Sequence, residues 1–308
     1  MRILVLRGGA LGDFLVTLPA LQLLRHKWPD ARIELVGHPA AGELGVLGGL
    51  LDAVHSQHEA RWGALHGDSP LAPDFAAWLG GFDLVVNYWP DPDGSLARHF
   101  PLRPNQHFVS GSPAPAIAPA ARHFCEPLRA LGLWTDDYRS RPRLPSAADL
   151  GLGTWDSGPA TAIHPGSGSP RKNWPAERWI EVIKRLDQPM LLILGEAERE
   201  QWSALTSTRL SPGISEQRLW DKSLHLAIEL PLSELAAALS RCRLFLGHDS
   251  GVSHLAAAVG VPCLLLFGPT DPAMWAPPGG HVRVIRRGES LDAIDVDEVL
   301  TTARALLV

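Results

Sequence analysis

The sequence predicts an α/β protein with two domains, each built around a parallel sheet, and three observations support this. The chain has 308 residues, enough for two domains of ordinary size. Two apolar strands, at 2–6 and 160–163, each run into a glycine-containing turn. Further strand and helix patterns alternate along both halves. Because the strands are continuously apolar, we expect both faces of each sheet to be covered.

In the N-terminal half, the pattern predicts one long helix and two further strands. Leucines at spacings of three and four predict a helix over 14–27, and apolar runs predict strands at 33–36 and 84–86. The segments 56–75 and 88–118 are rich in Pro, His, Gly and Ser. We expect them to be long loops of the kind that often carry function.

The alternation of strand and helix patterns is clearer in the C-terminal half. Helices and strands are predicted at 176–186, 190–194, 232–240, 244–246, 252–259, 263–267 and 296–307. The stretch 139–158 has little apolar period and much Pro, Ser, Asp and Gly. We therefore predict an N-terminal domain over 1–154 and a C-terminal domain over 155–308, with the final helix free to pack back on the N-terminal domain.

Composition indicates an ordinary globular protein and excludes several classes. With 45% hydrophobic residues, 20% charged residues and a net charge of −5, the chain is neither disordered nor suited to broad nucleic-acid binding. Cys125, Cys242 and Cys263 form no CxxC pair, which fits a reducing compartment. The N-terminus lacks the features of a signal peptide, and no run of 18 apolar residues predicts a membrane span. A cytoplasmic location is expected.

The first glycine turn, at 7–13, places backbone N–H groups at the start of a helix, where an anion or a substrate could bind. It is not GxGxxG, so a dinucleotide site is poorly supported. Asp13 has two interpretations. It could cap the helix, which this residue alone favours, or it could be a general base at the carboxyl end of a sheet, where open α/β proteins bind ligands.

The second turn, at 164–169, combines small residues with hydroxyls, including Ser167 and Gly168, and is followed by Arg171 and Lys172. Backbone donors beside a cation suit a diphosphate. The alternative is a polar loop with solvated charges, to which the segment alone gives about equal weight.

A third element, at 247–254, runs from a strand through a turn into a helix. Its Ser250 and Gly251 place N–H groups where they could bind phosphate oxygens. Asp249 could equally be only a cap, and His254 only a buried histidine. A fourth loop, 268–272, is by itself just a turn. The four loops together predict a ligand cleft between the domains, with a diphosphate on the second half and an acidic side chain facing it from the first.

These motifs resemble the bacterial heptosyltransferase family, glycosyltransferase family 9. The resemblance covers residues 1 to about 280, in order. It rests on Gly12-Asp13 with 17–21; on 164–167 with Lys172, Trp174-Pro175 and Trp179; and on 249–251 with 254–257, 260–262 and 267–270.

The resemblance implies a GT-B fold, that is, two facing Rossmann-like domains with an interdomain cleft and the donor mainly on the C-terminal one. It implies an inverting, metal-independent glycosyltransferase in which Asp13 activates the acceptor and Lys172 neutralises the donor phosphates. The diphosphate and sugar would be held by Asp249, Ser250, Gly251 and His254.

The resemblance also implies an acidic residue on the nucleotide ribose. Glu196, Glu198 and Glu200 compete for that match, and Glu198 is preferred. The backbone near Leu230 would border the base. The predicted binding set is completed by Gly12, Ser167, Gly168 and Thr270.

The implied donor is ADP-heptose, with no separate cofactor and no metal. The implied acceptor is a glycan such as the lipopolysaccharide inner core. A lipid-linked glycan implies transient contact with the inner membrane surface, and no nucleic-acid partner is expected. Two other functions remain open, a non-catalytic nucleotide-sugar-binding protein and a GT-B-type sugar-nucleotide epimerase.

Three features fall outside this pattern. His248 stands where a small or uncharged residue is expected. The pair Asp91 and Asp93 forms a DxD that we interpret as coincidental, since short motifs often match by chance. The arginines of the N-terminal half could contact an anionic acceptor, although most are expected at the plain surface; they are Arg7, Arg98, Arg103 and Arg122.

Overall fold

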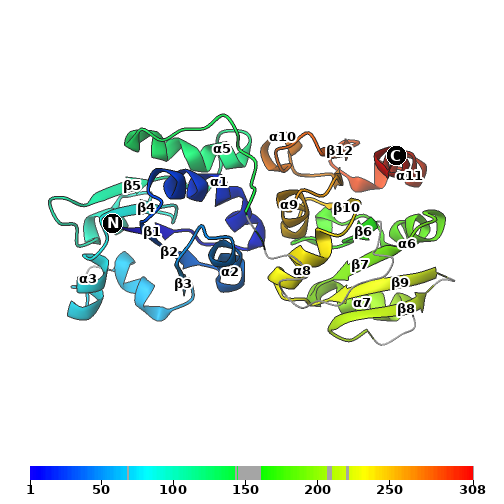
Figure 1. Cartoon of the computed structure of the whole chain (residues 1–308), viewed down its shortest axis with the longest axis horizontal. Coiled ribbons are helices and arrows are strands. Elements are labelled where there is room, and N and C mark those ends of the chain that lie inside the picture. The colour runs from blue at the N-terminus through cyan, green and yellow to red at the C-terminus, as the bar shows by residue number, and fades with distance from the viewer. Residues whose placement is uncertain (68, 143, 145–160, 207–209, 220–221, 308) are drawn as a thin grey trace. The chain divides into compact units, whose positions relative to one another are not determined.

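The structure is a computed structural model that describes residues 1–67, 69–142, 144, 161–206, 210–219 and 222–307. It divides into two compact units, Met1–Arg143 and Leu144–Val308 (Figure 1). The domain boundary predicted at 154/155 lies outside the described residues, so it stays a prediction.

The N-terminal unit holds a five-stranded sheet of order β3-β2-β1-β4-β5, and every neighbouring pair is parallel. Its strands are β1 (Arg2–Leu6), β2 (Arg32–Gly37), β3 (Ala53–Ser56), β4 (Leu84–Asn87) and β5 (His107–Ser110). Its helices are α1 (Leu11–Lys27), α2 (Pro39–Leu47), α3 (Pro73–Leu79), α4 (Ser95–His99) and α5 (Ala120–Cys125), with 3₁₀ helices η1 (Ala60–His66) and η2 (Glu126–Leu131).

Helices cover both faces of this sheet. Leu4 and Leu6 of β1 share a buried cluster with side chains of η1, α3 and α4. Successive strand residues point to opposite faces, so the face of Leu35 in β2 is the other one. There α2 packs so closely that a Cβ on Gly42 would lie 2.7 Å from Val54 and 3.2 Å from Leu35. α1 contacts α2 and α5 (Figure 1). The sheet is therefore covered on both sides, as its apolar strands predict.

The sequence predicted β1, α1, β2 and β4 of this unit and missed its other elements. The helix over 14–27 and the strands at 33–36 and 84–86 are confirmed by α1, β2 and β4. The expectation of long loops at 56–75 and 88–118 is wrong in part, because these segments contain η1, α3, α4 and β5. Each of those elements has four to seven residues, which is too short to show a clear apolar period.

The C-terminal unit holds a seven-stranded sheet of order β12-β11-β10-β6-β7-β9-β8, parallel throughout except for the antiparallel pair β8–β9. Its strands are β6 (Thr161–Ile163), β7 (Met190–Leu194), β8 (Gly213–Leu219), β9 (Lys222–Ile228), β10 (Leu244–His248), β11 (Cys263–Phe267) and β12 (Val282–Arg286). Its helices are α6 (Ala176–Arg185), α7 (Glu196–Thr206), α8 (Leu232–Leu239), α9 (Gly251–Ala258), α10 (Pro272–Trp275) and α11 (Val296–Leu307), with 3₁₀ helices η3 (Pro170–Lys172) and η4 (Leu291–Ala293).

The strand predicted at 160–163 is confirmed over Thr161–Ile163, and the other seven elements predicted for this half are confirmed within two residues at each end. β8, β9, β12 and α7 were not predicted. The final helix buries Val296, Val299, Leu300 and Ala303 in the core of its own unit, together with side chains of α6, α7 and the sheet. Packing of this helix back on the N-terminal domain stays a prediction.

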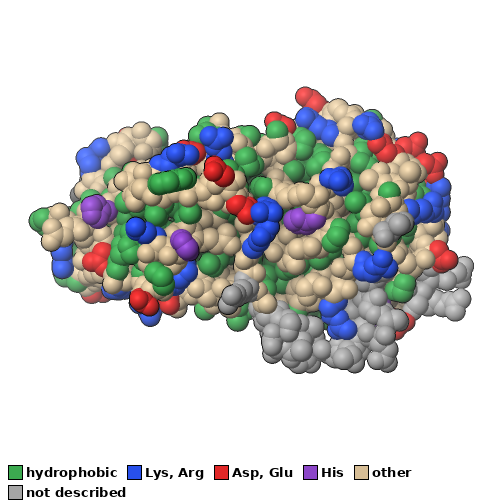
Figure 2. Space-filling view, turned by 45° about the horizontal axis from the view of Figure 1, so that its top comes forward, with side chains coloured by type: hydrophobic (Ala, Val, Ile, Leu, Met, Phe, Trp, Pro, Cys, Tyr) green, Lys and Arg blue, Asp and Glu red, His purple; other side chains and the backbone are tan. Residues whose placement is uncertain are grey.

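Among the residues that the structure describes, every helix is too short or too polar to cross a bilayer. On the face drawn in Figure 2, Lys and Arg side chains are interspersed with Asp and Glu.

Candidate functional site

The candidate residues follow strands at the topological switch points of both sheets. The chain leaves β1 toward β2 on one side and returns to β4 on the other. In the C-terminal unit, β6 has the same central place between β7 and β10. A crevice forms outside the carboxyl ends of the strands at such points, and ligands of open α/β folds bind there.

An ion pair between a buried arginine and a partly exposed aspartate follows β1. The Arg7 guanidinium donates through Nη2 to Asp13 Oδ1 at 2.9 Å and through Nε to Thr17 Oγ1 at 3.1 Å. It also lies 4.4 Å from the centre of the Phe124 ring in α5. Burial lowers the pKa of Arg7, and the Asp13 charge opposes that shift. Arg7 is therefore not one of the plain surface arginines, because it is buried directly after a strand that is covered on both faces.

Asp13 does not cap α1 in the predicted way. The N-cap is Ala10, and Asp13 is the third helical residue, whose Oδ2 accepts the Ala10 N–H at 2.9 Å. The carboxylate therefore satisfies one donor of the helix start, while 39% of the Asp13 side chain stays exposed. Gly12 precedes it in the first turn. A bound hydroxyl can reach the exposed side of this carboxylate.

The loop before Asp13 is held from a second strand. Gln57, which follows β3, accepts the Gly9 N–H at 3.0 Å and donates to the Gly9 carbonyl at 3.2 Å. Gly9 has φ 106°, and a Cβ there would lie 2.4 Å from Asp13 Oδ2. Only glycine fits this position without displacing the carboxylate. Gln57 was missed in the sequence, and Arg7 was considered there only as a possible contact for an anionic acceptor, not as the partner of Asp13.

In the C-terminal unit, the structure brings Lys172 and Asp249 together across 77 residues of sequence. Lys172 Nζ lies 3.1 Å from Asp249 Oδ2, and the side chains are 24% and 10% exposed. Lys172 ends η3 in the loop after β6, and Asp249 directly follows β10, the strand next to β6. A phosphate that approaches this pair meets the cation already oriented.

The start of α9 lies beside the pair. Ser250 is the N-cap and accepts the Ser253 N–H at 3.3 Å, so the alternative that Asp249 caps this helix is wrong. Gly251 is the first helical residue, and the buried His254 lies one turn further on. The first N–H groups of a helix have no partner within the helix. They suit an anion held next to Lys172.

The loop after β6 contains hydrogen bonds between its own polar groups. Ser167 Oγ lies 2.6 Å from Asn173 Oδ1 and 2.8 Å from the Ser169 carbonyl oxygen. Its hydroxyl therefore shapes the turn that leads to Lys172. Gly168 is exposed and has no heavy atom within 4 Å of where a Cβ would lie.

Among the three competing glutamates, only Glu198 faces the site. Its side chain is buried, whereas Glu196 and Glu200 are exposed. Glu198 Oε2 accepts the Gly195 N–H at 3.0 Å. Its carboxylate lies against the loop after β6, because a Cβ on Gly166 would lie 2.1 Å from Glu198 Oε1. Only glycine at 166 leaves room for this carboxylate.

Two further candidates follow neighbouring strands. Leu230 is half-buried after β9, next to Glu229, whose N–H donates to the Leu194 carbonyl at 2.9 Å. Thr270 follows β11, and its buried Oγ1 has no hydrogen-bond partner within the part of the chain that the structure describes. An unsatisfied buried hydroxyl is costly, and a ligand oxygen in this loop could satisfy it.

The DxD pair has a local structural role. Asp91 accepts the N–H groups of Leu96 at 2.9 Å and Ala97 at 3.1 Å, and Asp93 accepts that of Ser95 at 3.1 Å. Both carboxylates therefore accept N–H groups of the first turn of α4.

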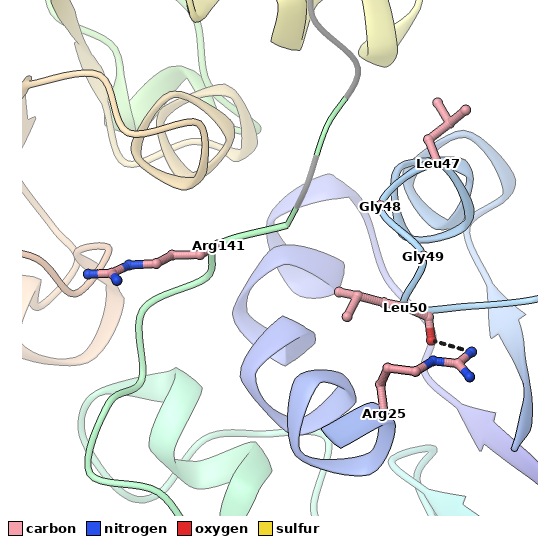
Figure 3. Close-up of a pocket in the computed structure, with 6 residues that line it drawn as sticks. All are labelled: Arg25, Leu47, Gly48, Gly49, Leu50 and Arg141. Carbon is pink, nitrogen blue, oxygen red and sulfur yellow. Dashed lines mark hydrogen bonds between the residues drawn. The ribbon is translucent and has the colours of Figure 1, made fainter. Parts of the chain in front are cut away.

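A pocket of about 520 Å³ in the N-terminal unit contains none of the predicted residues. It is lined by Arg25, Leu47, Gly48, Gly49, Leu50 and Arg141 (Figure 3). Arg25 donates to the Leu50 carbonyl at 3.3 Å and pairs with Asp52 at 2.7 Å, and the Arg141 side chain points away from Leu50 (Figure 3). The cations of this pocket are therefore not directed into it.

Two Rossmann-like units, each with polar residues at the carboxyl edge of its parallel sheet, define a two-domain protein of the GT-B fold. Residues 137–299, more than half of the chain, match the family model described as glycosyltransferase family 9 (heptosyltransferase). The chain belongs to this family, as the sequence motifs predicted.

Relatives and solved structures agree with that assignment. Lipopolysaccharide heptosyltransferase 2 of Salmonella typhimurium is 30% identical over 119 residues, which is 38% of this chain and 33% of that protein's length. Lipopolysaccharide heptosyltransferase 1 of Pseudomonas aeruginosa is 26% identical over 307 residues, covering 88% of this chain and 80% of that one. A glycosyl transferase of family 9 from Veillonella parvula has the same fold, with a TM-score of 0.77 at 22% identity over 99% of this chain and 97% of that chain.

Proposed function

We propose that this chain is an inverting, metal-independent glycosyltransferase that transfers heptose from ADP-heptose to a glycan acceptor of the lipopolysaccharide inner core. The observation that carries the proposal is the Lys172–Asp249 pair at 3.1 Å beside the start of α9. A cation and helix N–H groups at one place form a ready site for the diphosphate of a sugar nucleotide.

The neighbouring strands provide for the rest of the donor. Glu198, Leu230 and Thr270 follow β7, β9 and β11, so the five adjacent strands from β11 to β9 each contribute a candidate residue or loop. Strands in a sheet lie about 4.8 Å apart, so these loops spread over roughly 19 Å. We assign Glu198 to the ribose hydroxyls, Leu230 to the base, and Lys172 to the diphosphate. Asp249 holds Lys172 and accepts from sugar hydroxyls, because a carboxylate repels phosphate.

In the proposed reaction the acceptor hydroxyl attacks the anomeric carbon from the face opposite the diphosphate. The new carbon–oxygen bond forms as the bond to the β-phosphate oxygen breaks, and the electron pair leaves with ADP, so the configuration inverts. Asp13 takes the hydroxyl proton. Lys172 and the N–H groups of α9 stabilise the charge that develops on the diphosphate. Closure of the two domains brings Asp13 to the donor and excludes water.

A nucleotide panel tests the donor half of this proposal. ADP, GDP, UDP and CDP are each added to the full chain, and the unfolding midpoint is measured, because a ligand that binds only the folded state raises it. We expect the largest shift with ADP. A larger shift with another nucleotide would replace ADP in the proposal, and no shift with any of the four would contradict it.

A second assay separates transfer from the two alternatives. ADP-heptose is incubated with the protein, with and without a heptose-deficient lipopolysaccharide core, and released ADP and the remaining sugar nucleotide are measured. Acceptor-dependent ADP release supports transfer. Binding without release supports a binding protein, and conversion of the donor without acceptor supports an epimerase. Membrane contact is tested by co-sedimentation with vesicles that contain the acceptor.

A further inference from the structure

His248, which departs from the sequence pattern, occupies the centre of the C-terminal site. It ends β10, and its side chain is fully buried beside the Lys172–Asp249 pair. Its Nε2 accepts the buried Trp174 N–H at 2.9 Å. A ring nitrogen that accepts must carry a lone pair, so the imidazole is neutral with its proton on Nδ1.

The His248–Trp174 hydrogen bond and the Lys172–Asp249 ion pair connect the same two segments of the chain. Trp174 lies two residues after Lys172, and Asp249 directly follows His248. The segment 172–174 is thus tied to the dipeptide 248–249 at both ends, by the His248–Trp174 hydrogen bond and the Lys172–Asp249 pair. The loop that carries the cation therefore cannot move away from β10 without breaking one of the two.

The main chain of His248 also forms a hydrogen bond to the first turn of α9. Its carbonyl oxygen accepts from Ser253 Oγ at 2.5 Å, and Ser253 Oγ lies 3.1 Å from Oγ of the N-cap Ser250. The ring packs edge-on against Trp179 of α6, with centroids 5.3 Å apart. The buried His248 thus links Lys172, Asp249 and the N-terminus of α9.

We propose that His248 is a positioning residue that holds Lys172 and the α9 N-terminus in register for the diphosphate. The inference rests on the proposed function, since it concerns the same site. Burial lowers the pKa of His248 to about 3, and the nearby His164 adds to that shift. The acceptor nitrogen is therefore unprotonated at neutral pH.

Two amide substitutions test the hydrogen bond. In His248→Gln the side-chain amide can place its oxygen where Nε2 lies, so the Trp174 N–H keeps an acceptor. In His248→Asn the side chain is shorter and its oxygen matches Nδ1 instead, so the N–H loses its acceptor. His248→Leu removes the polar group. The control is His281→Leu, which removes the hydrogen bond from His281 Nε2 to the Ala257 carbonyl at the other end of the sheet.

The readout is the affinity for a nucleoside diphosphate divided by that for the matching monophosphate, by calorimetry. The probe is whichever of ADP, GDP, UDP and CDP the wild type binds best. We expect this ratio to fall about tenfold in His248→Asn and His248→Leu, and to stay within about threefold of wild type in His248→Gln and His281→Leu. A diphosphate-selective loss is not expected from a purely structural role.

The inference is overturned if His248→Asn keeps the wild-type ratio, if His248→Gln loses as much as His248→Asn, or if both affinities fall together. His248→Gln and His248→Asn decide the question even if His248→Leu does not fold. A wild type that binds none of the four nucleotides contradicts the proposed function itself. That result differs from a wild type that binds and a His248→Asn variant that binds equally well.

Discussion

The two candidate sites are built differently, although each lies at the carboxyl edge of a parallel sheet. The carboxylate of Asp13 is held by local partners, Arg7 six residues away and Ala10 three residues away. The diphosphate site depends on a contact between residues 77 apart and on loops from neighbouring strands. A single turn can therefore position an acid–base group, whereas the phosphate site requires loops from several neighbouring strands to be correctly placed.

Loss of Lys172 is expected to have the largest effect among substitutions in the C-terminal unit. Lys172→Ala removes the only cation we assign to the diphosphate and leaves Asp249 unpaired beside it. We expect kcat/KM to fall by about 10²–10³, as for removal of a transition-state electrostatic contact. Lys172→Arg should recover part of the activity. Exposed Lys184 of α6 provides the control, and an equal loss in Lys184→Ala would show a general effect of charge.

Loss of Arg7 tests whether the N-terminal carboxylate needs its local partner. Arg7→Met fills similar space without the guanidinium, so Asp13 loses the bond to Oδ1. We expect kcat to fall roughly 10- to 100-fold, with nucleotide affinity unchanged. Steady-state kinetics beside calorimetry separates the two. Arg122→Met, at an exposed arginine of α5 paired with Glu126, should behave as wild type. A loss of nucleotide affinity in Arg7→Met would contradict the local role.

Substitution of Glu198, the glutamate assigned to the ribose, is expected to have a smaller effect. Glu198→Gln is expected to weaken nucleotide binding by about tenfold, because a charge-assisted bond to a ribose hydroxyl becomes a neutral one. Glu196→Gln and Glu200→Gln, at exposed positions of the same helix, should leave the affinity unchanged. If either of them weakens binding more than Glu198→Gln, the assignment of the ribose contact is wrong.

The smallest effect expected is on stability as a function of pH. Burial lowers the pKa values of His164 and His248 below their usual 6.5. Below pH 6.5 the unfolded chain binds protons that the folded chain does not, so stability falls as the pH falls. Each such histidine contributes at most about 1.4 kcal/mol per pH unit. Urea unfolding between pH 7.5 and 5 should show a shallower fall in His248→Gln than in wild type. Equal slopes would contradict the shift at His248.

Much of the fold could be predicted from the sequence because its central strands are apolar runs. Residues 244–246 of β10 and 263–267 of β11 are apolar without interruption and are followed by turn residues, a pattern typical of a buried strand. The strands β8 and β9 carry mixed polar residues at the sheet edge, and η1 and α4 are short, so their patterns were not distinctive. The order of strands, which brings Asp249 beside the loop of Lys172, was not predicted, because it depends on pairing between segments far apart in the sequence.

The site could be predicted in part. Asp13, Lys172 and Asp249 were named from motifs, but the partner of Asp13 was missed because an arginine at a strand end resembles a surface residue. Glu198 could have been selected with more assurance. It lies four residues before the buried Trp202 in α7, and residues four apart share a helix face. His248 could not be assigned, because its role depends on Trp174, a residue 74 positions earlier that meets it only in the folded sheet.

The most direct test of the account is single-turnover transfer by Asp13→Asn with donor and acceptor both saturating. Rapid quenching measures the chemical step, and calorimetry with ADP measures the C-terminal site in the same preparation. The account predicts a rate lower by about 10²–10⁴ with unchanged ADP affinity, since the proton acceptor is lost and the diphosphate site is intact. A wild-type transfer rate in Asp13→Asn would contradict it.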